Sequence, residues 1–161
     1  MIKACFYKYL RQHQCPIKRI IFPRYLRFLR EITRNMTVNE ITYEIRGAIY
    51  EVYKTLGPGL LESVYEEALT FELQQRGLKV ERQVQVPIEY KGNTLKTELR
   101  LDMLVEDKVI IELKSVKELL DVHFKQTLTY CKLLNKRIGI LVNFYVDDIL
   151  DNAIHRIVNN L

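Results

Sequence analysis

Two acidic residues and one lysine are the main candidates for chemistry, because they lie in stretches of sequence that are otherwise apolar. Glu112 and Lys114 belong to the run VIIELK at residues 109–114, and a run this apolar is typical of a strand buried on both faces. Side chains alternate along a strand, so Glu112 and Lys114 share one face. Asp102 lies in the preceding strand-like stretch. Charged groups in such surroundings need a counter-charge or a cation.

A tight turn at residues 106–108 predicts that Asp102 lies opposite Glu112, with the Cβ atoms about 5 Å apart. Two carboxylates at this distance must become protonated, pair with Lys114 or bind a cation. Mg²⁺, or Mn²⁺ in its place, binds carboxylates and keeps positions for water and phosphate oxygens, as phosphodiester hydrolysis requires. Lys114 would orient or deprotonate the attacking water and offset transition-state charge. The alternative is a plain ion pair between Glu112 and Lys114, with Asp102 in solvent.

Glu62 is a candidate third acid, since it follows the turn GPG at residues 57–59 and begins an expected helix. The turn would bring this helix end close to the sheet and add Glu62 to the metal or its water. The alternative is that an acid is simply favoured at a helix start by the helix dipole. Tyr65 lies one turn further on the same face and is a candidate substrate contact, although by itself a core position suits it better.

Gln126 and Tyr130 stand four residues apart and therefore share a face of a later expected helix. Gln126 is a candidate ligand of a phosphate or a metal-bound water, and Tyr130 is a candidate contact of the substrate backbone. His123 lies one turn earlier and is a further candidate contact. Each of the three, taken singly, also suits a polar position on a packed helix.

Periodicity and turn residues predict the elements that position these side chains. A capping box at Thr37 and Glu40 predicts the start of the first helix, which should end at the GPG turn. The expected order is α-α-β-β-β-α-β-α, an α/β fold. Its later elements are a helix at 61–75, strands at 80–90, 94–105 and 108–114, a helix at 117–134, a strand at 138–142 and a closing helix from 147.

The composition suits one folded domain at 36–161, with 48% hydrophobic residues in a chain of 161. An apolar run of about 18 residues is missing, so we expect no membrane contact and a cytoplasmic location. Three scattered cysteines favour free thiols over disulfides or zinc. Residues 1–35 hold nine of the bases and one acid, so the net charge of +5 belongs to this extension, which we expect to be disordered or loosely docked.

The candidate residues, in this order, resemble the PD-(D/E)XK phosphodiesterase superfamily. Asp102 is followed by the ExK element ELK at 112–114 and by the QxxxY element QTLTY at 126–130. The segment GLLESVY at 59–65 is more specific, because it matches the motif that names the GxxExxY proteins, a bacterial and archaeal group assigned to this superfamily. The resemblance covers about residues 40 to 158. Residues 1–35 match nothing in the family, and Tyr53 stands where a histidine is expected.

The resemblance implies a restriction-endonuclease-like core, in which a three-stranded antiparallel meander and a further strand are flanked by helices. It also implies roles for the candidate residues, with Asp102 and Glu112 as the metal-binding acids, Glu62 as the helical acid, Lys114 as the catalytic lysine, and Gln126 with Tyr130 as the QxxxY pair. The implied function is divalent-metal-dependent hydrolysis of nucleic acid, with DNA favoured over RNA. The alternative is a non-catalytic module that binds nucleic acid or protein, and a homodimer stays open.

Overall fold

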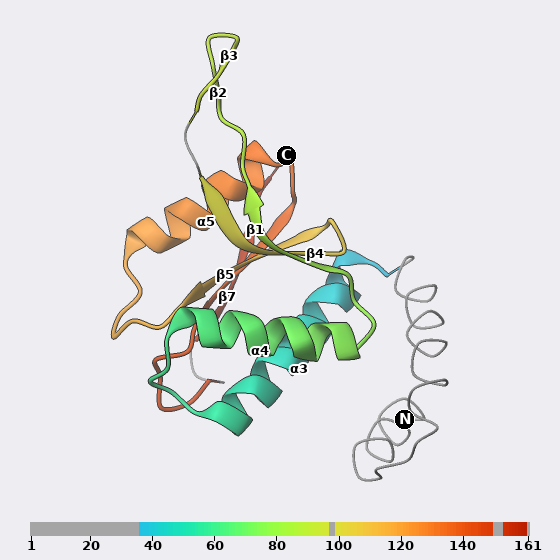
Figure 1. Ribbon diagram of the computed structural model, residues 1–161, viewed down its shortest axis with the longest axis vertical. Coiled ribbons are helices and arrows are strands. Elements are labelled where there is room, and N and C mark those ends of the chain that lie inside the picture. Colours follow the sequence, from blue (N-terminus) through green and yellow to red (C-terminus); the bar gives the residue numbers. More distant parts are fainter. Residues whose placement is uncertain (1–35, 97–98, 150–152, 161) are drawn as a thin grey trace.

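The computed structural model describes residues 36–96, 99–149 and 153–160, so the basic extension at 1–35 lies outside the described residues (Figure 1). Helices and strands follow one another in an order that matches most of the expected one. The described elements are α3 (Val38–Leu56), α4 (Glu62–Gln75), β1 (Val80–Gln85), β2 (Glu89–Tyr90), β3 (Asn93–Thr94), β4 (Arg100–Val105), β5 (Val109–Lys114), α5 (Asp121–Leu133), β6 (Ile138–Asn143) and β7 (Ile154–Val158).

Helix α3 begins and ends where the sequence predicts. The Glu40 amide donates to the Thr37 hydroxyl at 3.3 Å, and the Glu40 carboxylate accepts from the Thr37 amide at 2.8 Å, which completes the capping box. The helix stops at Gly57, whose φ of 68° is a conformation that glycine adopts without a steric penalty. None of the described helices is long and apolar enough to cross a membrane.

A five-stranded sheet in the order β1-β4-β5-β6-β7 forms the centre of the fold. Neighbours β1, β4 and β5 are antiparallel, which confirms the predicted meander, and β6 lies parallel to β5 after the crossover helix α5. Helices α3 and α4 cover one face, and α5 covers the other (Figure 1). Each face has its own apolar core, so β5 is buried on both sides, as its sequence indicates.

The predicted closing helix is wrong. The last described element is strand β7, which pairs antiparallel with the free edge of β6, from Ile138 opposite Val158 to Val142 opposite Ile154. Apolar residues at 154, 157 and 158 fit a helical spacing as well as an edge strand, so the short pattern does not decide between them. The edge of β6 favours the strand, because the backbone N–H and C=O groups along that edge need hydrogen-bond partners. Helix α5 also begins at Asp121, four residues later than expected.

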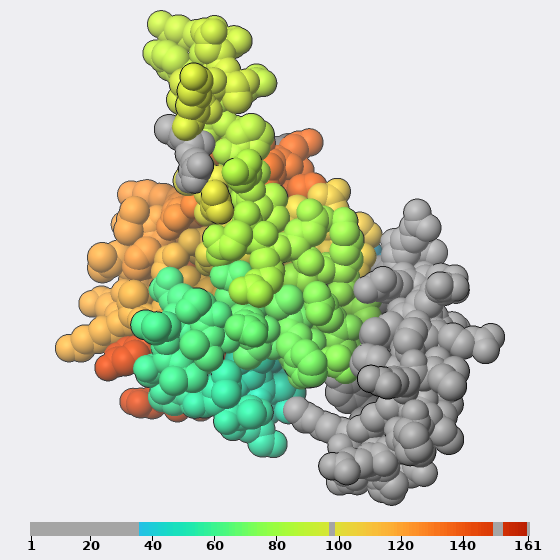
Figure 2. Space-filling view, in the orientation of Figure 1, coloured from blue at the N-terminus to red at the C-terminus, as the bar shows by residue number. Residues whose placement is uncertain are grey.

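The long strands predicted at 80–90 and 94–105 are each interrupted. The ends next to the turn at residues 91–92 form a separate two-stranded sheet of β2 and β3. This sheet projects from the body of the molecule (Figures 1 and 2). The predicted turn is present, with φ of 50° at Lys91 and 79° at Gly92. The described residues from 89 to 96 are all exposed, so this hairpin adds nothing to either core.

Helix α5 packs closely on β6 at Gly139, which gives a test of how firmly the crossover helix is held. A Cβ atom added at Gly139 would lie 2.8 Å from Thr127 Cγ2 and 2.9 Å from Cys131 Sγ. We expect Gly139→Ala to lower the free energy of unfolding by roughly 1–3 kcal/mol in urea denaturation, because α5 must move away. Gly47→Ala is the control, since the added Cβ meets only the guanidinium of Arg76, the far end of a long side chain. An equal loss in both variants would contradict this packing argument.

Candidate catalytic site

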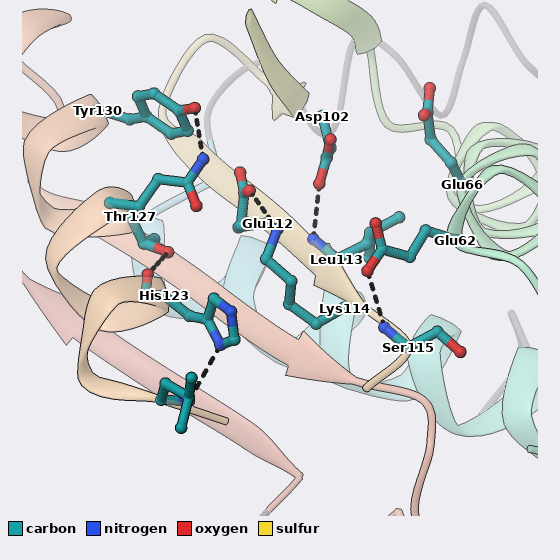
Figure 3. Close-up of polar contacts among 12 residues, drawn as sticks. Glu62, Glu66, Asp102, Glu112, Leu113, Lys114, Ser115, His123, Thr127 and Tyr130 are labelled. Carbon is teal, nitrogen blue, oxygen red and sulfur yellow. Dashed lines mark hydrogen bonds and ion pairs between the residues drawn. The ribbon is translucent and has the colours of Figure 1, made fainter. Parts of the chain in front are cut away.

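The hairpin of β4 and β5 brings Asp102 and Glu112 to one end of the sheet. Met103 pairs with Ile111, and the same register continues to the turn, so the predicted register is confirmed for these residues, although the ladder ends before the predicted pair of Asp102 with Glu112. Beyond this pair, the Asp102 carboxylate accepts a hydrogen bond from the Leu113 amide at 2.8 Å (Figure 3). A side chain therefore takes the amide that a regular ladder would give to a backbone carbonyl, and the strand ends separate around the acids.

Glu112 and Lys114 form a buried ion pair with an Oε1–Nζ distance of 2.7 Å. Glu112 is 2% exposed, and its second oxygen, Oε2, is buried without a hydrogen-bond partner among the described residues. A buried carboxylate oxygen with no partner is costly and invites a further positive group. The ion pair considered as an alternative is therefore present, but it leaves half of the carboxylate unsatisfied.

Burial dominates the electrostatics of the two acids. It raises the pKa of Glu112 to about 7, with a further contribution from the negative charge of Asp102, while Lys114 opposes the shift. Burial also raises the pKa of Asp102, and the hydrogen bond from the Leu113 amide and the charge of Lys114 oppose it. The charge of Asp102 thus disfavours ionisation of Glu112, and burial disfavours ionisation of both carboxylates.

Lys114 keeps its proton in this arrangement. Burial acts to lower the pKa of Lys114, but the hydrogen bond to Glu112 and the negative charges of Glu112, Asp102 and Glu62 outweigh it and raise the pKa. A lysine in this state is a poor base for water. Of the two roles expected from the sequence, the electrostatics favour neutralising developing negative charge.

Glu62 lies at the start of α4, as expected, and the helix end is tied to the end of β5. Glu62 Oε1 accepts from the Ser115 amide at 3.0 Å, and the Ser115 hydroxyl donates to the Leu60 carbonyl at 2.7 Å. The glycine turn therefore does bring this helix close to the sheet. Glu62 is exposed and faces the same region as Lys114 (Figure 3), while its role as a metal ligand stays a prediction.

The predicted pair on α5 is oriented toward the acids. Gln126 Nε2 donates to the Tyr130 hydroxyl at 2.8 Å, and Tyr130 is 2% exposed. Burial raises the pKa of Tyr130, the hydrogen bond with Gln126 lowers it, and the charges of Glu112 and Asp102 raise it further. Tyr130 lies on the side of the site opposite α4 (Figure 3), and Gln126 is hydrogen-bonded to it.

Tyr65 and His123 have structural partners. Tyr65 is fully buried and stacks on Phe144 with ring centroids 4.2 Å apart, and its hydroxyl donates to the Gly57 carbonyl at 2.7 Å. His123 Nδ1 accepts from the Leu120 amide at 3.1 Å at the start of α5. These contacts explain both residues as organisers of the turns that flank the site. Contact of either residue with a substrate stays a prediction.

Two buried polar residues near the site were missed by the sequence reasoning. Asn143, at the end of β6, accepts from the Val116 amide at 3.1 Å and donates to the Val116 carbonyl at 2.7 Å, which fixes the segment after Lys114. Glu66 is 6% exposed and lies one helical turn after Glu62. An acid four residues from Glu62 on the same face was the available signal for Glu66.

The donor set fits a divalent cation, although the side chains are engaged elsewhere. No group of three or more His, Cys, Asp or Glu side chains in the described ranges is arranged to hold a metal ion. Asp102 and Glu62 each accept a backbone amide, and the Lys114 ammonium stands beside Glu112. The donors are nevertheless all hard oxygens, as Mg²⁺ prefers, and Glu112 Oε2 lacks the partner that a cation would supply.

Comparison with known proteins places this geometry in a family. No curated protein and no solved structure matches the chain. A family model described as the PD-(D/E)XK nuclease superfamily matches residues 39–157, a range that contains both acids, the lysine and the pair on α5. The match spans most of the chain and agrees with the five-stranded sheet flanked by helices. The chain therefore belongs to the PD-(D/E)XK nuclease superfamily.

Proposed function

We propose that the protein hydrolyses phosphodiester bonds of nucleic acid with the help of Mg²⁺ or Mn²⁺. One observation carries the proposal: Asp102, Glu112 and Lys114 meet where β4 and β5 separate, and a buried oxygen of Glu112 lacks a partner. A structural ion pair alone would not need a second carboxylate beside it, since the negative charge of Asp102 makes ionisation of Glu112 less favourable.

Asp102 and Glu112 would hold the metal, with Glu62 as a third acidic group on the metal or its water. The bound ion would polarise the phosphoryl group and lower the pKa of a water molecule. Lys114, released from Glu112 by the cation, would place its charge beside the phosphate oxygens. Its raised pKa supports this role over that of a general base.

The Tyr130 hydroxyl and the Gln126 amide support binding of the substrate backbone from the side of α5. We assign DNA as the favoured substrate over RNA, and place the chain in the bacterial and archaeal GxxExxY group through Gly59, Glu62 and Tyr65. A cytoplasmic location accords with this function. Residues 36–161 carry a net charge of −3, so either a local basic patch or bound metal ions would have to screen the phosphates at the site.

The second candidate is a non-catalytic binding module, which could act as a homodimer. The ion pair of Glu112 with Lys114 favours it, because the pair neutralises one acid without a metal. Melting of the full chain with and without Mg²⁺ or Mn²⁺ separates the candidates. A metal site predicts a higher Tm with metal in the wild type and no rise in Asp102→Asn, because binding to the folded state stabilises it by about 3 kcal/mol at a hundredfold excess over Kd.

Asp107→Asn is the matched control, since Asp107 is an exposed acid at the turn of the same hairpin and pairs with Lys136. It should keep the full metal-induced rise in Tm. A wild-type Tm that does not respond to either metal would remove the proposed cofactor and leave the binding module.

Affinity for Mn²⁺ should depend on pH through Glu112. The folded pKa of about 7 means that a proton occupies this carboxylate in acid solution and must leave before a cation binds. We therefore expect the affinity to fall by about tenfold for each pH unit below about 7, and to level off above it. Titration of the full chain with Mn²⁺ between about pH 6 and pH 8 measures this. An affinity that does not change over this range would contradict the assignment of Glu112 as a ligand.

A further inference from the structure

Strand β4 changes faces at the point that carries Asp102. Leu101 packs in the apolar core beneath α5, whereas Met103 packs in the core beneath α3 and α4. Residues two apart in a regular strand face the same side, so the alternation is broken between them. On the neighbouring strand β1, Arg82 pairs with Met103 and Val84 with Leu101. The reversal therefore falls on Asp102 and on the residue opposite it in β1.

That opposite residue is Gln83, which has a φ of 48°. A residue with a Cβ atom is strained in the left-handed region, so contacts with other residues must hold Gln83 there. Because Gln83 is kinked, the paired positions on either side of it are kept while Asp102 is released from the regular ladder. The free side chain of Asp102 then reaches the Leu113 amide.

Glu66 of helix α4 forms hydrogen bonds with the kinked segment of β1. Its Oε2 accepts from Gln83 Nε2 at 2.7 Å, and its Oε1 accepts from Arg82 Nε at 2.6 Å. The Glu66 side chain is 8% exposed, so both hydrogen bonds to its charged carboxylate form in a partly desolvated place, where they are strong. Glu62 and Glu66 stand one turn apart on α4. The same helix therefore carries the acid that lies at the site and the acid that is hydrogen-bonded to Gln83.

We propose that Glu66 is a positioning residue, which acts through Gln83 to turn Asp102 out of the β ladder and toward the site. The inference rests on the proposed function, because Asp102 needs this orientation only if it serves the metal. Glu66 itself touches neither Glu112 nor Lys114. Both oxygens of its carboxylate accept hydrogen bonds from side chains of β1, which distinguishes it from the acids of the site.

The Leu113 amide reports the orientation of Asp102 in the absence of metal. We expect Glu66→Ala to speed hydrogen exchange at this amide by about tenfold beyond the change at other amides of β5, because its acceptor moves away. Affinity for Mn²⁺ should fall by about tenfold in the same variant, the usual loss when a group that orients a ligand is removed. Both measurements use the full chain.

Three further variants decide the mechanism. Glu66→Gln keeps an acceptor for Arg82 and, after rotation of the Gln83 amide, a partner for Gln83, so it should behave like the wild type. Gln83→Gly combined with Glu66→Ala should recover Leu113 protection, because glycine adopts the positive φ without strain. Glu72→Ala is the matched control, since Glu72 is an equally buried acid of α4 that pairs with Arg76 away from the site. It should leave the Leu113 amide and the Mn²⁺ affinity unchanged.

The outcomes separate this inference from the proposed function. If Leu113 exchange in Glu66→Ala rises no more than in Glu72→Ala, the positioning role is wrong, whatever the metal does. If Leu113 is selectively deprotected but the wild type does not bind Mn²⁺, the metal site fails and Glu66 still orients Asp102. Selective deprotection, weaker Mn²⁺ binding and rescue by glycine at 83 together support both.

Discussion

Replacement of Lys114 by methionine is expected to reduce metal-dependent cleavage of nucleic acid by about a thousandfold while it increases the affinity for Mn²⁺. The two effects have one cause. Lys114 stands 2.7 Å from Glu112 and competes with a cation for that carboxylate, yet its charge is what the transition state needs. Methionine keeps much of the length and packing of the side chain and removes only the charge.

Isothermal titration with Mn²⁺ and single-turnover cleavage by the full chain measure the two effects separately. Lys117→Met is the control, because Lys117 is an exposed lysine shortly after the same strand. It should change neither quantity appreciably. Cleavage that survives in Lys114→Met, or an affinity for Mn²⁺ that falls with it, would show that Lys114 does not balance the charge of Glu112 in the way described.

The second large effect concerns stability. The variant that combines Glu112→Leu with Lys114→Met should be more stable than the wild type in metal-free buffer. We expect its free energy of unfolding to be higher by roughly 1–4 kcal/mol. Desolvation makes the buried pair expensive, and Glu112 Oε2 gains no hydrogen bond in return. Leucine leaves no buried donor or acceptor without a partner, and it removes the repulsion of Asp102.

This gain should grow with pH. The folded pKa of Glu112, about 7, lies above its ordinary value of 4.5, so the folded state holds this proton more tightly than the unfolded state does. The resulting stability is fully present below about pH 4.5 and is lost as the pH rises to about 7, a loss of about 3 kcal/mol. Urea denaturation at about pH 5 and pH 8 should therefore give a larger gain at the higher pH.

Lys114→Met alone is the informative comparison, since it leaves Glu112 buried without its counter-charge. It should be less stable than the double variant and should regain stability when Mn²⁺ is added. A double variant that is less stable than the wild type at both pH values would mean that the ion pair stabilises the fold, which favours the binding module over the metal site.

Apolar runs and turn residues allowed much of the fold to be predicted. The register of β4 against β5 follows from a turn of three residues and from the apolar run that must be buried on both faces. The capping box at Thr37 and Glu40 sets the start of α3 through contacts within four residues. Such features depend on local chemistry, so a single sequence contains them.

Features that depend on distant parts of the chain could not be predicted in this way. Strand β7 was expected as a helix because its short apolar pattern fits both, and only the free edge of β6 selects the strand. The hydrogen bond from the Leu113 amide to Asp102 occurs beside the kink at Gln83, and Gln83 is hydrogen-bonded to Glu66 in a different element. The spacing of the acids in the sequence predicted that they lie close together. The contacts that orient their side chains are tertiary, so the sequence alone did not predict them.

The most direct test of the metal-dependent site is cleavage of single- and double-stranded DNA and RNA by the full chain, with Mg²⁺, with Mn²⁺ and with EDTA. Wild type, Asp102→Asn and Glu112→Gln should be compared with Asp107→Asn as the control. The expected result is cleavage by wild type and control that requires metal and is lost in both site variants, with DNA cut in preference to RNA. Cleavage that persists in EDTA or in the site variants, or no cleavage of any substrate by a wild-type chain that binds the metal, would contradict a metal-dependent nuclease at Asp102, Glu112 and Lys114.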